Sequence, residues 1–249
     1  MTSPGVPSRV VSLVPSVTET LLTWGVTPVA CTRFCEQPDL PQVGGTKDPD
    51  VAAIVELRPD LVVLCPEENR REDADALAAA GLVTASLSID AVGDVGPALH
   101  MLAALVGADG GEGEEGIGAG MARLDALAAA GDPPPRLRAF VPIWKRPWMT
   151  LSGGTYGSSL LAAVGVANVF AGAAERYPTV TLDEARARRP DVVLAPSEPY
   201  PFAERHVPLL EEVAPVVLVD GQDLFWWGAR TPAALARLRD RLAEVGPTG

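Results

Sequence analysis

The feature that most constrains the fold is a phrase that the sequence contains twice. Residues 58–68 read RPDLVVLCPEE, and residues 189–198 read RPDVVLAPSE. In both copies Arg-Pro-Asp opens a β-branched apolar run, which ends at a proline and is soon followed by Glu68 or Glu198. The copies lie about half of the chain apart, so the sequence predicts two similar lobes with a cleft between them.

Apolar strands alternate with helical segments along the chain, which indicates parallel α/β lobes. The expected strands are 9–14, 28–32, 61–65, 82–89, 138–143, 191–195 and 216–220. The expected helices are 16–25, 51–58, 71–81, 91–107, 113–130, 156–165, 182–189 and 232–245. We expect Ser16 or Thr18, Asp48 or Asp50, and Thr181 to cap helices. Residues 144–150 are expected to form a loop.

The helix expected at 113–130 separates the two sets of elements. At a rise of ~1.5 Å per residue it would be about 27 Å long, which suits a rigid strut between lobes. We therefore expect an N-terminal lobe over 1–108, a connecting helical segment over 109–134 and a C-terminal lobe over 135–249.

Composition limits the class of partner. The formal net charge is −12, and no basic stripe with interleaved aromatic residues is present, which argues against a nucleic-acid partner. No segment is long and apolar enough to span a bilayer. The first residues lack a basic stretch followed by an apolar one, so no secretory signal is visible. We therefore expect a cytosolic protein, a true start further upstream, or a trimmed chain.

Cysteines and histidines give no metal-site or catalytic pattern. Cys31, Cys35 and Cys65 form no CxxC pair, so free thiols are expected, with a Cys31–Cys35 bridge as the alternative in an oxidising compartment. His100 and His206 have no close acidic partner in the sequence and do not make a three-ligand metal site. Because GxSxG, HExxH and P-loop motifs are absent, no catalytic residue is predicted.

Aromatic and cationic residues gather in the loops that follow the expected strands. Ligands of parallel α/β lobes bind outside the carboxyl ends of the strands, and four of the five tryptophans lie in such loops. Arg33, Lys145 and Arg146 are available for the anionic groups of a ligand. The pattern favours a flat, partly apolar ligand, and the alternative for any single tryptophan is a place in the core.

Glu68 and Glu198 occupy matching places in the two copies of the repeated phrase. A loop glutamate is usually just solvated, but the duplication favours a further role. One acidic residue on each lobe suits docking onto a symmetric partner that presents arginines.

Four phrases spread over most of the chain resemble the helical-backbone substrate-binding proteins of ABC importers, the group that includes the cobalamin-binding and siderophore-binding proteins. In chain order they are SLVPSVTETLLTWG, QVGGTKDPDVAAIVELRPDLVVL, SGGTYGSSLLAAVGVANVF and VTLDEARARRPDVVLAPSE. The cobalamin-binding branch looks most similar. The resemblance implies an α/β fold of two Rossmann-like lobes with parallel sheets, joined by one long backbone helix, with the ligand in the cleft between the lobes.

The resemblance also implies a function. The chain would be a monomeric binding protein and not an enzyme, with cobalamin, haem or a ferric siderophore as transported ligand and no intrinsic cofactor or metal. In that family, which is extracytoplasmic and does not itself span the membrane, one glutamate per lobe docks onto arginines of a dimeric permease; this carries over to Glu68, or Glu67, and Glu198. The residues expected to contact the ligand are Arg33, Phe34, Trp144, Lys145, Trp148, Tyr156, Tyr200, Phe202, His206, Trp226 and Trp227.

Two other functions fit the same two-lobed scaffold. One is a cytosolic, chelatase-like enzyme. The other is a cytosolic sensor that passes its ligand-bound state to a protein partner through Glu68 and Glu198. A signal peptide upstream, or neighbouring permease and ATPase genes, would favour transport.

Overall fold

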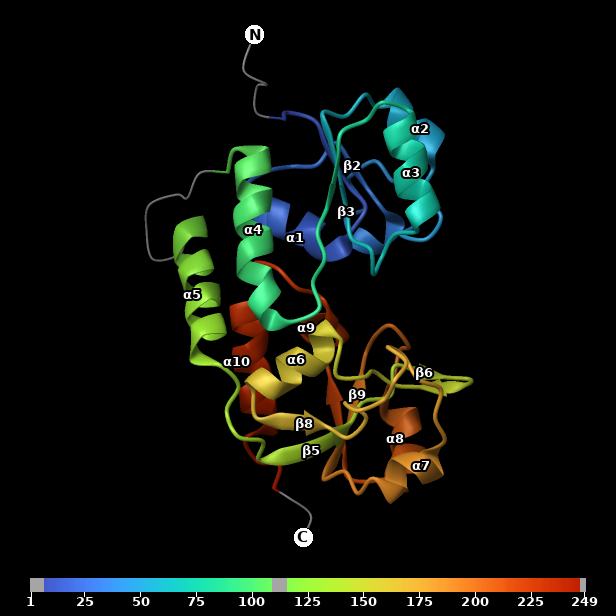
Figure 1. The fold of residues 1–249 in the computed structure, drawn as a ribbon. Coiled ribbons are helices and arrows are strands. Elements are labelled where there is room, and N and C mark those ends of the chain that lie inside the picture. The colour runs from blue at the N-terminus through green and yellow to red at the C-terminus, as the bar shows by residue number, and fades with distance from the viewer. Residues whose placement is uncertain (1–6, 109–115, 247–249) are drawn as a thin grey trace. The chain divides into compact units, whose positions relative to one another are not determined.

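The computed structural model describes residues 7–108 and 116–246 (Figure 1). Contacts divide these residues into two compact units, each built on its own parallel sheet. The first unit holds residues 7–89, 94–108, 116–125 and 227–229, and the second holds residues 90–93, 126–226 and 230–246. The predicted fold class, α/β with two parallel-sheet lobes, is confirmed.

The two sheets have the same strand order. The first contains β1 (Val10–Ser12), β2 (Ala30–Cys31), β3 (Leu61–Leu64) and β4 (Thr84–Ser86) in the order β2-β1-β3-β4. The second contains β5 (Leu137–Phe140), β8 (Val166–Asn168), β9 (Val192–Pro196) and β10 (Val216–Val219) in the order β10-β9-β5-β8. All these pairings are parallel. In each sheet the direction of winding reverses between the first and third strands, β1 and β3 or β5 and β9, which is where open α/β sheets bind ligands.

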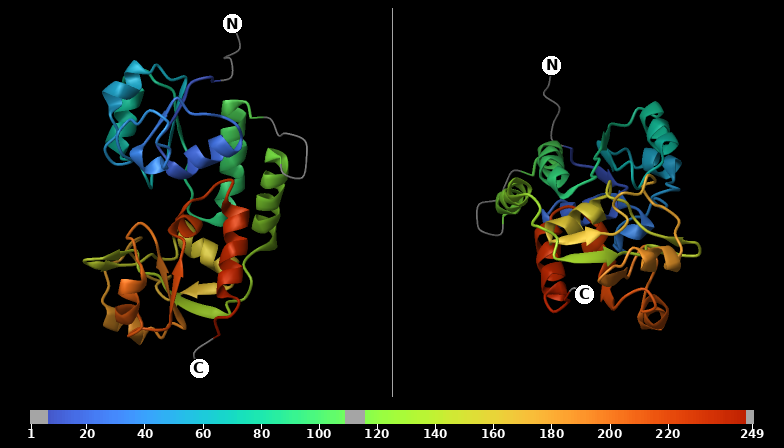
Figure 2. Two further views of the ribbon diagram at one scale, coloured as in Figure 1. Left: turned by 180° about the vertical axis from the view of Figure 1, so that it is seen from behind. Right: turned by 60° about the horizontal axis from the view of Figure 1, so that its bottom comes forward.

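Helices flank each sheet (Figures 1 and 2). In the first unit α2 (Val51–Glu56) and α3 (Arg71–Ala79) lie together on one side of the strands, apart from α1 (Pro15–Thr23) and α4 (Val92–Val106). In the second, α7 (Leu182–Ala187) and α8 (Val207–Leu210) lie on one side, and α6 (Tyr156–Ala163), α9 (Gly221–Phe225) and α10 (Thr231–Leu242) on the other. The helix α5 (Ile117–Ala130), short 3-10 turns, η1 (Arg33–Cys35) and η2 (Glu204–His206), and the antiparallel hairpin β6 (Trp144–Lys145) and β7 (Trp148–Met149) complete the described elements.

The arginine that opens each copy of the repeated phrase ends a helix. Arg58 follows α2 with φ of 47°, and Arg189 follows α7 with φ of 50°. This left-handed conformation terminates a helix, and the following proline has no N–H with which to continue it. Both copies therefore turn the chain from a helix into the third strand of a sheet.

The aspartate of each copy ties the third strand to the first. Asp60 Oδ2 accepts a hydrogen bond from the Arg9 amide at 2.9 Å, and Asp191 Oδ2 accepts one from the Arg138 amide at 2.8 Å. The Arg9 guanidinium donates to the carbonyl of Leu57, and that of Arg138 to the carbonyls of the corresponding helix end. The repeated phrase is thus a structural repeat as well as a sequence repeat.

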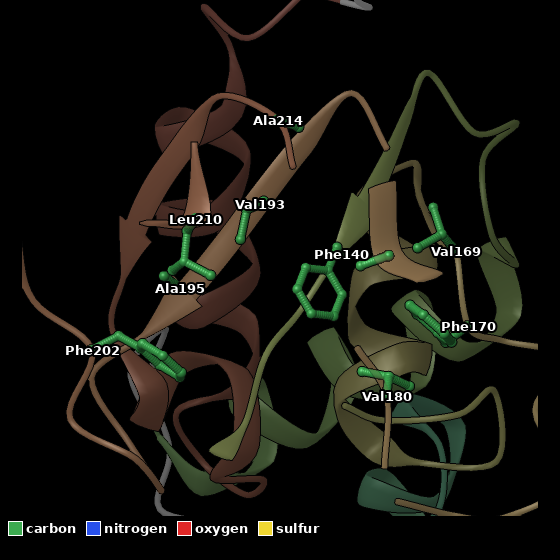
Figure 3. Packing of buried hydrophobic residues seen from close by; sticks show 10 residues of the cluster. Phe140, Val169, Phe170, Val180, Val193, Ala195, Phe202, Leu210 and Ala214 are labelled. Carbon is green, nitrogen blue, oxygen red and sulfur yellow. The ribbon is translucent and has the colours of Figure 1, made fainter. Parts of the chain in front are cut away.

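One buried apolar cluster of the second unit lies on the side of its sheet that α7 and α8 cover. Figure 3 shows Phe140 from β5 beside Val180 and Phe170, and Phe202 beside Ala195 and Leu210. The Phe140 and Phe170 rings are 5.8 Å apart. The strands β3 and β9 are buried along their whole length, as their unbroken apolar runs predict.

The helix caps are predicted with mixed success. Asp50 caps α2, since its side chain accepts a hydrogen bond from the Ala53 amide at 3.0 Å, and Thr181 forms a capping box on α7. The expectation that Ser16 or Thr18 caps the first helix is wrong, because α1 begins at Pro15 with Val14 as its N-cap. The proline supplies a fixed φ at the first helical position and needs no N–H partner there.

Two further expectations are corrected or limited. Residues 144–150 contain the hairpin β6–β7, because the flanking Trp144–Met149 and Lys145–Trp148 pairs come into register. The unit boundary falls inside α5 (Ile117–Ala130), between Asp125 and Ala126. Residues 113–115 of the expected connecting helix lie outside the described residues, and the expected division of the chain at 108 and 134 stays a prediction.

Candidate ligand-binding site

Five ring-bearing residues form a contiguous cluster beyond the carboxyl ends of β5 and β9. We call Trp144, Trp148, Tyr200, Phe202 and His206 the aromatic cluster. The chain leaving β5 forms the β6–β7 hairpin, which carries the two tryptophans. The chain leaving β9 carries the other three rings. Because β5 and β9 are neighbours at the point where the winding of the sheet reverses, the two loops meet.

The rings contact one another in a chain from the hairpin to the β9 loop. Trp148 stacks on Phe202 with ring centroids 6.0 Å apart and an interplanar angle of 6°. Tyr200 lies 4.8 Å from Phe202 and meets Trp144 edge-on at 5.6 Å. These separations are those of favourable aromatic pairs, so the rings hold the two loops together.

The cluster has a buried base and an exposed rim. Phe202 and His206 are 5% and 3% exposed and belong to the interior, whereas Trp144 is 43% exposed. Tyr200 and Trp148 are partly buried between these extremes. Exposure of a large indole ring at the reversal point of a sheet is unusual for a residue whose only task is packing.

His206 supports the cluster from beneath. Its Nδ1 accepts a hydrogen bond from the Ala203 amide at 3.1 Å, so the proton of the neutral ring is on Nε2. Its ring meets Tyr200 and Phe202 edge-on, each at 5.5 Å. Burial, followed by the positive charges of Lys145 and Arg205, lowers the pKa of His206. The structure places this expected ligand contact under the rim, where it orients other rings.

An open groove of about 770 Å³ adjoins the hairpin. Its lining is Lys145, Arg146, Pro147, Trp148, Thr179, Val180, Thr181, Leu182, Asp183, Arg186, Leu209 and Glu212. Arg186 is held by Asp183 at 2.9 Å and by the Glu212 carbonyl at 2.7 Å. The sequence did not indicate the groove residues from α7, because Thr181 and the residues after it predicted only the start of a helix.

Three predicted contact residues lie elsewhere in the fold. Tyr156 on α6 is buried, and its hydroxyl pairs with Thr231 Oγ1 at 3.0 Å; burial raises its pKa well above the usual range. Trp227 is 5% exposed and groups with the first unit. Trp226 lies under the Arg230 guanidinium, 5.4 Å from the ring centroid. Their predicted ligand contacts stay predictions.

The predicted contacts of the first unit lie on η1, directly after β2. Phe34 is 50% exposed, and the guanidinium carbon of Arg33 lies 4.9 Å from its ring centroid. Arg33 also forms an ion pair with Asp48 at 2.8 Å. The pair presents an aromatic face and a cation together at the surface of this unit.

The three predicted docking glutamates follow the third strand of each sheet. Glu68 is partly buried, and burial raises its pKa, against which the charge of Lys47 acts. The neighbouring Glu67 offers its carbonyl to the Lys47 ammonium at 2.6 Å. Glu198 is partly buried beside Gly221, where an added Cβ would lie 2.6 Å from the Glu198 amide nitrogen. The turn after β9 therefore holds Glu198 by close local packing.

Asn69 shows how the turn after β3 is fixed. It is buried, its Oδ1 accepts from the Cys65 amide at 2.9 Å, and its Nδ2 donates to the carbonyls of Leu13 and Thr46. One side chain thus joins three loops where the winding of the first sheet reverses. In the sequence, Asn69 is marked only by its position directly after the repeated glutamate. In the structure, its side chain holds the turn in place.

Over residues 7–108 and 116–246, no group of three or more histidine, cysteine or acidic side chains is arranged to hold a metal ion. Within the same residues no helix is long and apolar enough to cross a membrane.

Sequence comparison finds relatives along most of the chain. Residues 10–213 match the family model described as periplasmic binding protein. A vitamin B12-binding protein of Vibrio vulnificus is 26% identical over 196 residues, which cover 74% of this chain and 70% of the relative. A vitamin B12-binding protein of Salmonella choleraesuis is 26% identical over 195 residues, with 75% and 71% coverage.

Structure comparison gives the same fold. The periplasmic vitamin B12-binding protein of Vibrio cholerae matches with a TM-score of 0.77 at 20% identity, covering 96% of this chain and 98% of that one. A periplasmic heme-binding protein of Pseudomonas aeruginosa matches with a TM-score of 0.74 at 19% identity, with 98% and 95% coverage. With a family match that spans most of its length, the chain belongs to the periplasmic binding protein family.

Proposed function

We propose that this chain is the substrate-binding protein of an ABC-type importer and that it binds cobalamin or a related metal chelate, such as haem or a ferric siderophore. The observation that carries the proposal is the aromatic cluster, with its exposed Trp144 rim, at the reversal point of the second sheet. The names of the relatives, vitamin B12-binding and heme-binding proteins, support this ligand class.

The chemistry of the rim suits a flat, conjugated macrocycle or chelate. Trp144 and Tyr200 present apolar ring faces with polar edges, which stack against a planar ligand and still tolerate water at its periphery. Lys145 and Arg146 lie on the same hairpin and can pair with carboxylate or phosphate groups of such a ligand. The protein would act by binding alone, with the metal arriving inside the ligand.

The contacts expected from Arg33 and Phe34 belong to the same proposal. Their exposed aromatic face and cation repeat, on the first unit, the combination that the hairpin offers on the second. Ligand contacts by Tyr156 and Trp227 are expected to be indirect, since both are buried, whereas Trp226 is only partly buried and keeps its expected contact.

The importer role rests on Glu68, with its neighbour Glu67, and on Glu198. We propose that one glutamate from each unit docks onto arginines of a dimeric permease. Equivalent placement after β3 and β9 supports this role, because a two-fold symmetric partner presents the same arginines twice. Their positions are the same in both units while the residues that follow them differ, so the repeat preserves the acidic group itself.

The test is a fluorescence titration of the purified, ligand-free protein with cyanocobalamin, hemin and a panel of ferric siderophores. A ligand on the rim should quench tryptophan emission in a saturable way, because Trp144 and Trp148 lie at the proposed site. We expect one ligand class to give micromolar or tighter binding, roughly −8 kcal/mol or better. A response no larger than that of free tryptophan for every ligand would refute the proposal.

A further inference from the structure

Two buried cysteine side chains meet in the first unit. Cys31 is the last residue of β2, and Cys35 is the last residue of η1. A backbone hydrogen bond of 3.1 Å from the Cys35 amide to the Thr32 carbonyl folds the chain back on itself. The two thiols are 0% and 2% exposed, and each shifts the pKa of the other.

Two threonine hydroxyls complete the surroundings of Cys35. Thr18 Oγ1 and Thr32 Oγ1 each lie 3.2 Å from Cys35 Sγ. Hydrogen bonds from Cys31 and from the threonines lower the pKa of Cys35, whereas the same thiol pairing and burial raise the pKa of Cys31. Donors that converge on one sulfur stabilise its thiolate, which is the nucleophilic form of cysteine.

The segment that carries Cys35 lies at the surface although its sulfur is covered. The residues on either side, Phe34 and Glu36, are exposed, and Glu36 leaves the turn with φ of 54°. A short 3-10 turn with exposed neighbours opens more readily than a strand inside a sheet. Local opening of η1 therefore exposes Cys35 while Cys31 stays in β2.

From these contacts we infer that Cys31 and Cys35 are a redox-active dithiol, which a small-molecule disulfide oxidises to an intramolecular bridge. The Cys35 thiolate attacks one sulfur of the oxidant, which forms a mixed disulfide and releases one thiolate. Cys31 then loses its proton and attacks the Cys35 sulfur, which closes the bridge and releases the second thiolate. Two protein thiols are oxidised, the oxidant is reduced to two thiols, and the two protons pass to the released thiolates.

Cys65 is the internal control for this inference. It is buried at the end of the β3 strand, and burial raises its pKa to about 11. A buried thiol held in its neutral form is a poor nucleophile. We therefore expect Cys65 to remain a free thiol when the other two are oxidised.

The experiment incubates the folded, reduced protein with oxidised glutathione and then counts free thiols after denaturation. Three cysteines are present, and we expect the treated protein to retain a single titratable thiol. Peptide mapping without reductant should find the Cys31–Cys35 bridge, and reductant should reverse it. The inference is overturned by retention of all three thiols, or by a bridge or stable glutathione adduct at Cys65.

Single variants test the roles of the two sulfurs. Cys31→Ala should accumulate a glutathione adduct on Cys35, because the mixed disulfide cannot be resolved, whereas Cys35→Ala should leave Cys31 unmodified. Cys65→Ala is the matched control and should bridge as fast as the parent protein. An adduct on Cys31 in the Cys35→Ala variant would overturn the assigned order of attack. Where a variant fails to fold, peptide mapping of the protein without substitutions still shows whether the Cys31–Cys35 bridge forms.

Discussion

The exposed rim and buried base of the aromatic cluster assign different tasks to neighbouring rings. Trp144 contributes little to the packing of its unit, because almost half of its surface is open to solvent. Phe202 and His206 are nearly covered and fix the rings above them. Binding and stability should therefore respond separately to substitution at the rim and at the base.

Trp144→Ala should weaken ligand binding and leave the fold intact. Loss of the exposed ring removes a stacking face, for which we expect about a ten-fold weaker Kd, or ~1.4 kcal/mol. The free energy of unfolding should fall by about 1 kcal/mol or less, because the exposed ring gives up only its edge-on contact with Tyr200. Equilibrium dialysis and urea unfolding measure the two quantities. Met101→Ala, at a residue of similar exposure (46%) on α4, is the control and should alter neither.

His206 should make the second unit less stable in mild acid. Above its ordinary pKa of about 6.5, the residue is neutral in both the folded and unfolded chains. As the pH falls below that value, the unfolded chain gains a proton that the folded chain resists, because burial lowers the folded pKa. Stability should fall until the pH reaches the folded pKa. A protonated Nδ1 would also point its N–H at the Ala203 amide.

The measurement is urea unfolding of the wild type and His206→Asn between about pH 7 and pH 5, the window set by the ordinary pKa. Asn keeps a hydrogen-bond acceptor but does not titrate, so the variant should lose part of the pH dependence. The groups that face His206 are Lys145, Arg205 and Tyr200. Equal slopes for the wild type and His206→Asn would refute the role.

At the scale of elements, the repeated phrase shows what the sequence can predict. The buried strands β3 and β9 are visible as apolar runs, since a strand covered on both faces needs no alternation. The left-handed conformations of Arg58 and Arg189 are not visible, because arginine has no special preference for positive φ. The hairpin β6–β7 is also missed, since strands of two residues are too short to produce a pattern.

The two aspartates of the repeat should differ in energetic weight. Asp191 is 8% exposed and accepts a hydrogen bond from the Arg138 amide. Asp191→Ala would leave that backbone N–H without its partner and should lower the free energy of unfolding by about 1–3 kcal/mol. Asp60 has the same role at an exposed site, and Asp60→Ala should cost less, because water can replace the carboxylate. Urea unfolding of both variants gives the comparison. A larger loss of stability for Asp60→Ala than for Asp191→Ala would contradict this prediction.

At the scale of the whole molecule, the duplicated sequence predicts two α/β units because each half carries its own set of strands and helices. The shared strand order then brings the loops after β5 and β9 together, which unites Trp144, Trp148, Tyr200 and Phe202 from separate parts of the chain. The burial of Tyr156 and Trp227 was not predictable, because aromatic residues near strand or helix ends serve cores and surfaces equally.

The proposed docking role of Glu68 and Glu198 belongs to the scale of the whole molecule, since the two residues lie on different units. Glu68→Arg combined with Glu198→Arg should abolish stimulation of the cognate permease and ATPase in proteoliposomes, because like charges would then face the arginines of the permease. Binding of the free ligand should be unchanged, and this separates docking from recognition. Unaltered stimulation by the double variant would remove the docking role.

The most direct test of the central claim is equilibrium dialysis of the ligand-free protein against cyanocobalamin, hemin and ferric siderophores. We expect saturable binding of one chelate per chain, with the affinity reduced when Trp144 and Tyr200 are both replaced by alanine. The same affinity in the doubly substituted protein, or no saturable binding by the wild type to any of these chelates, would contradict this claim.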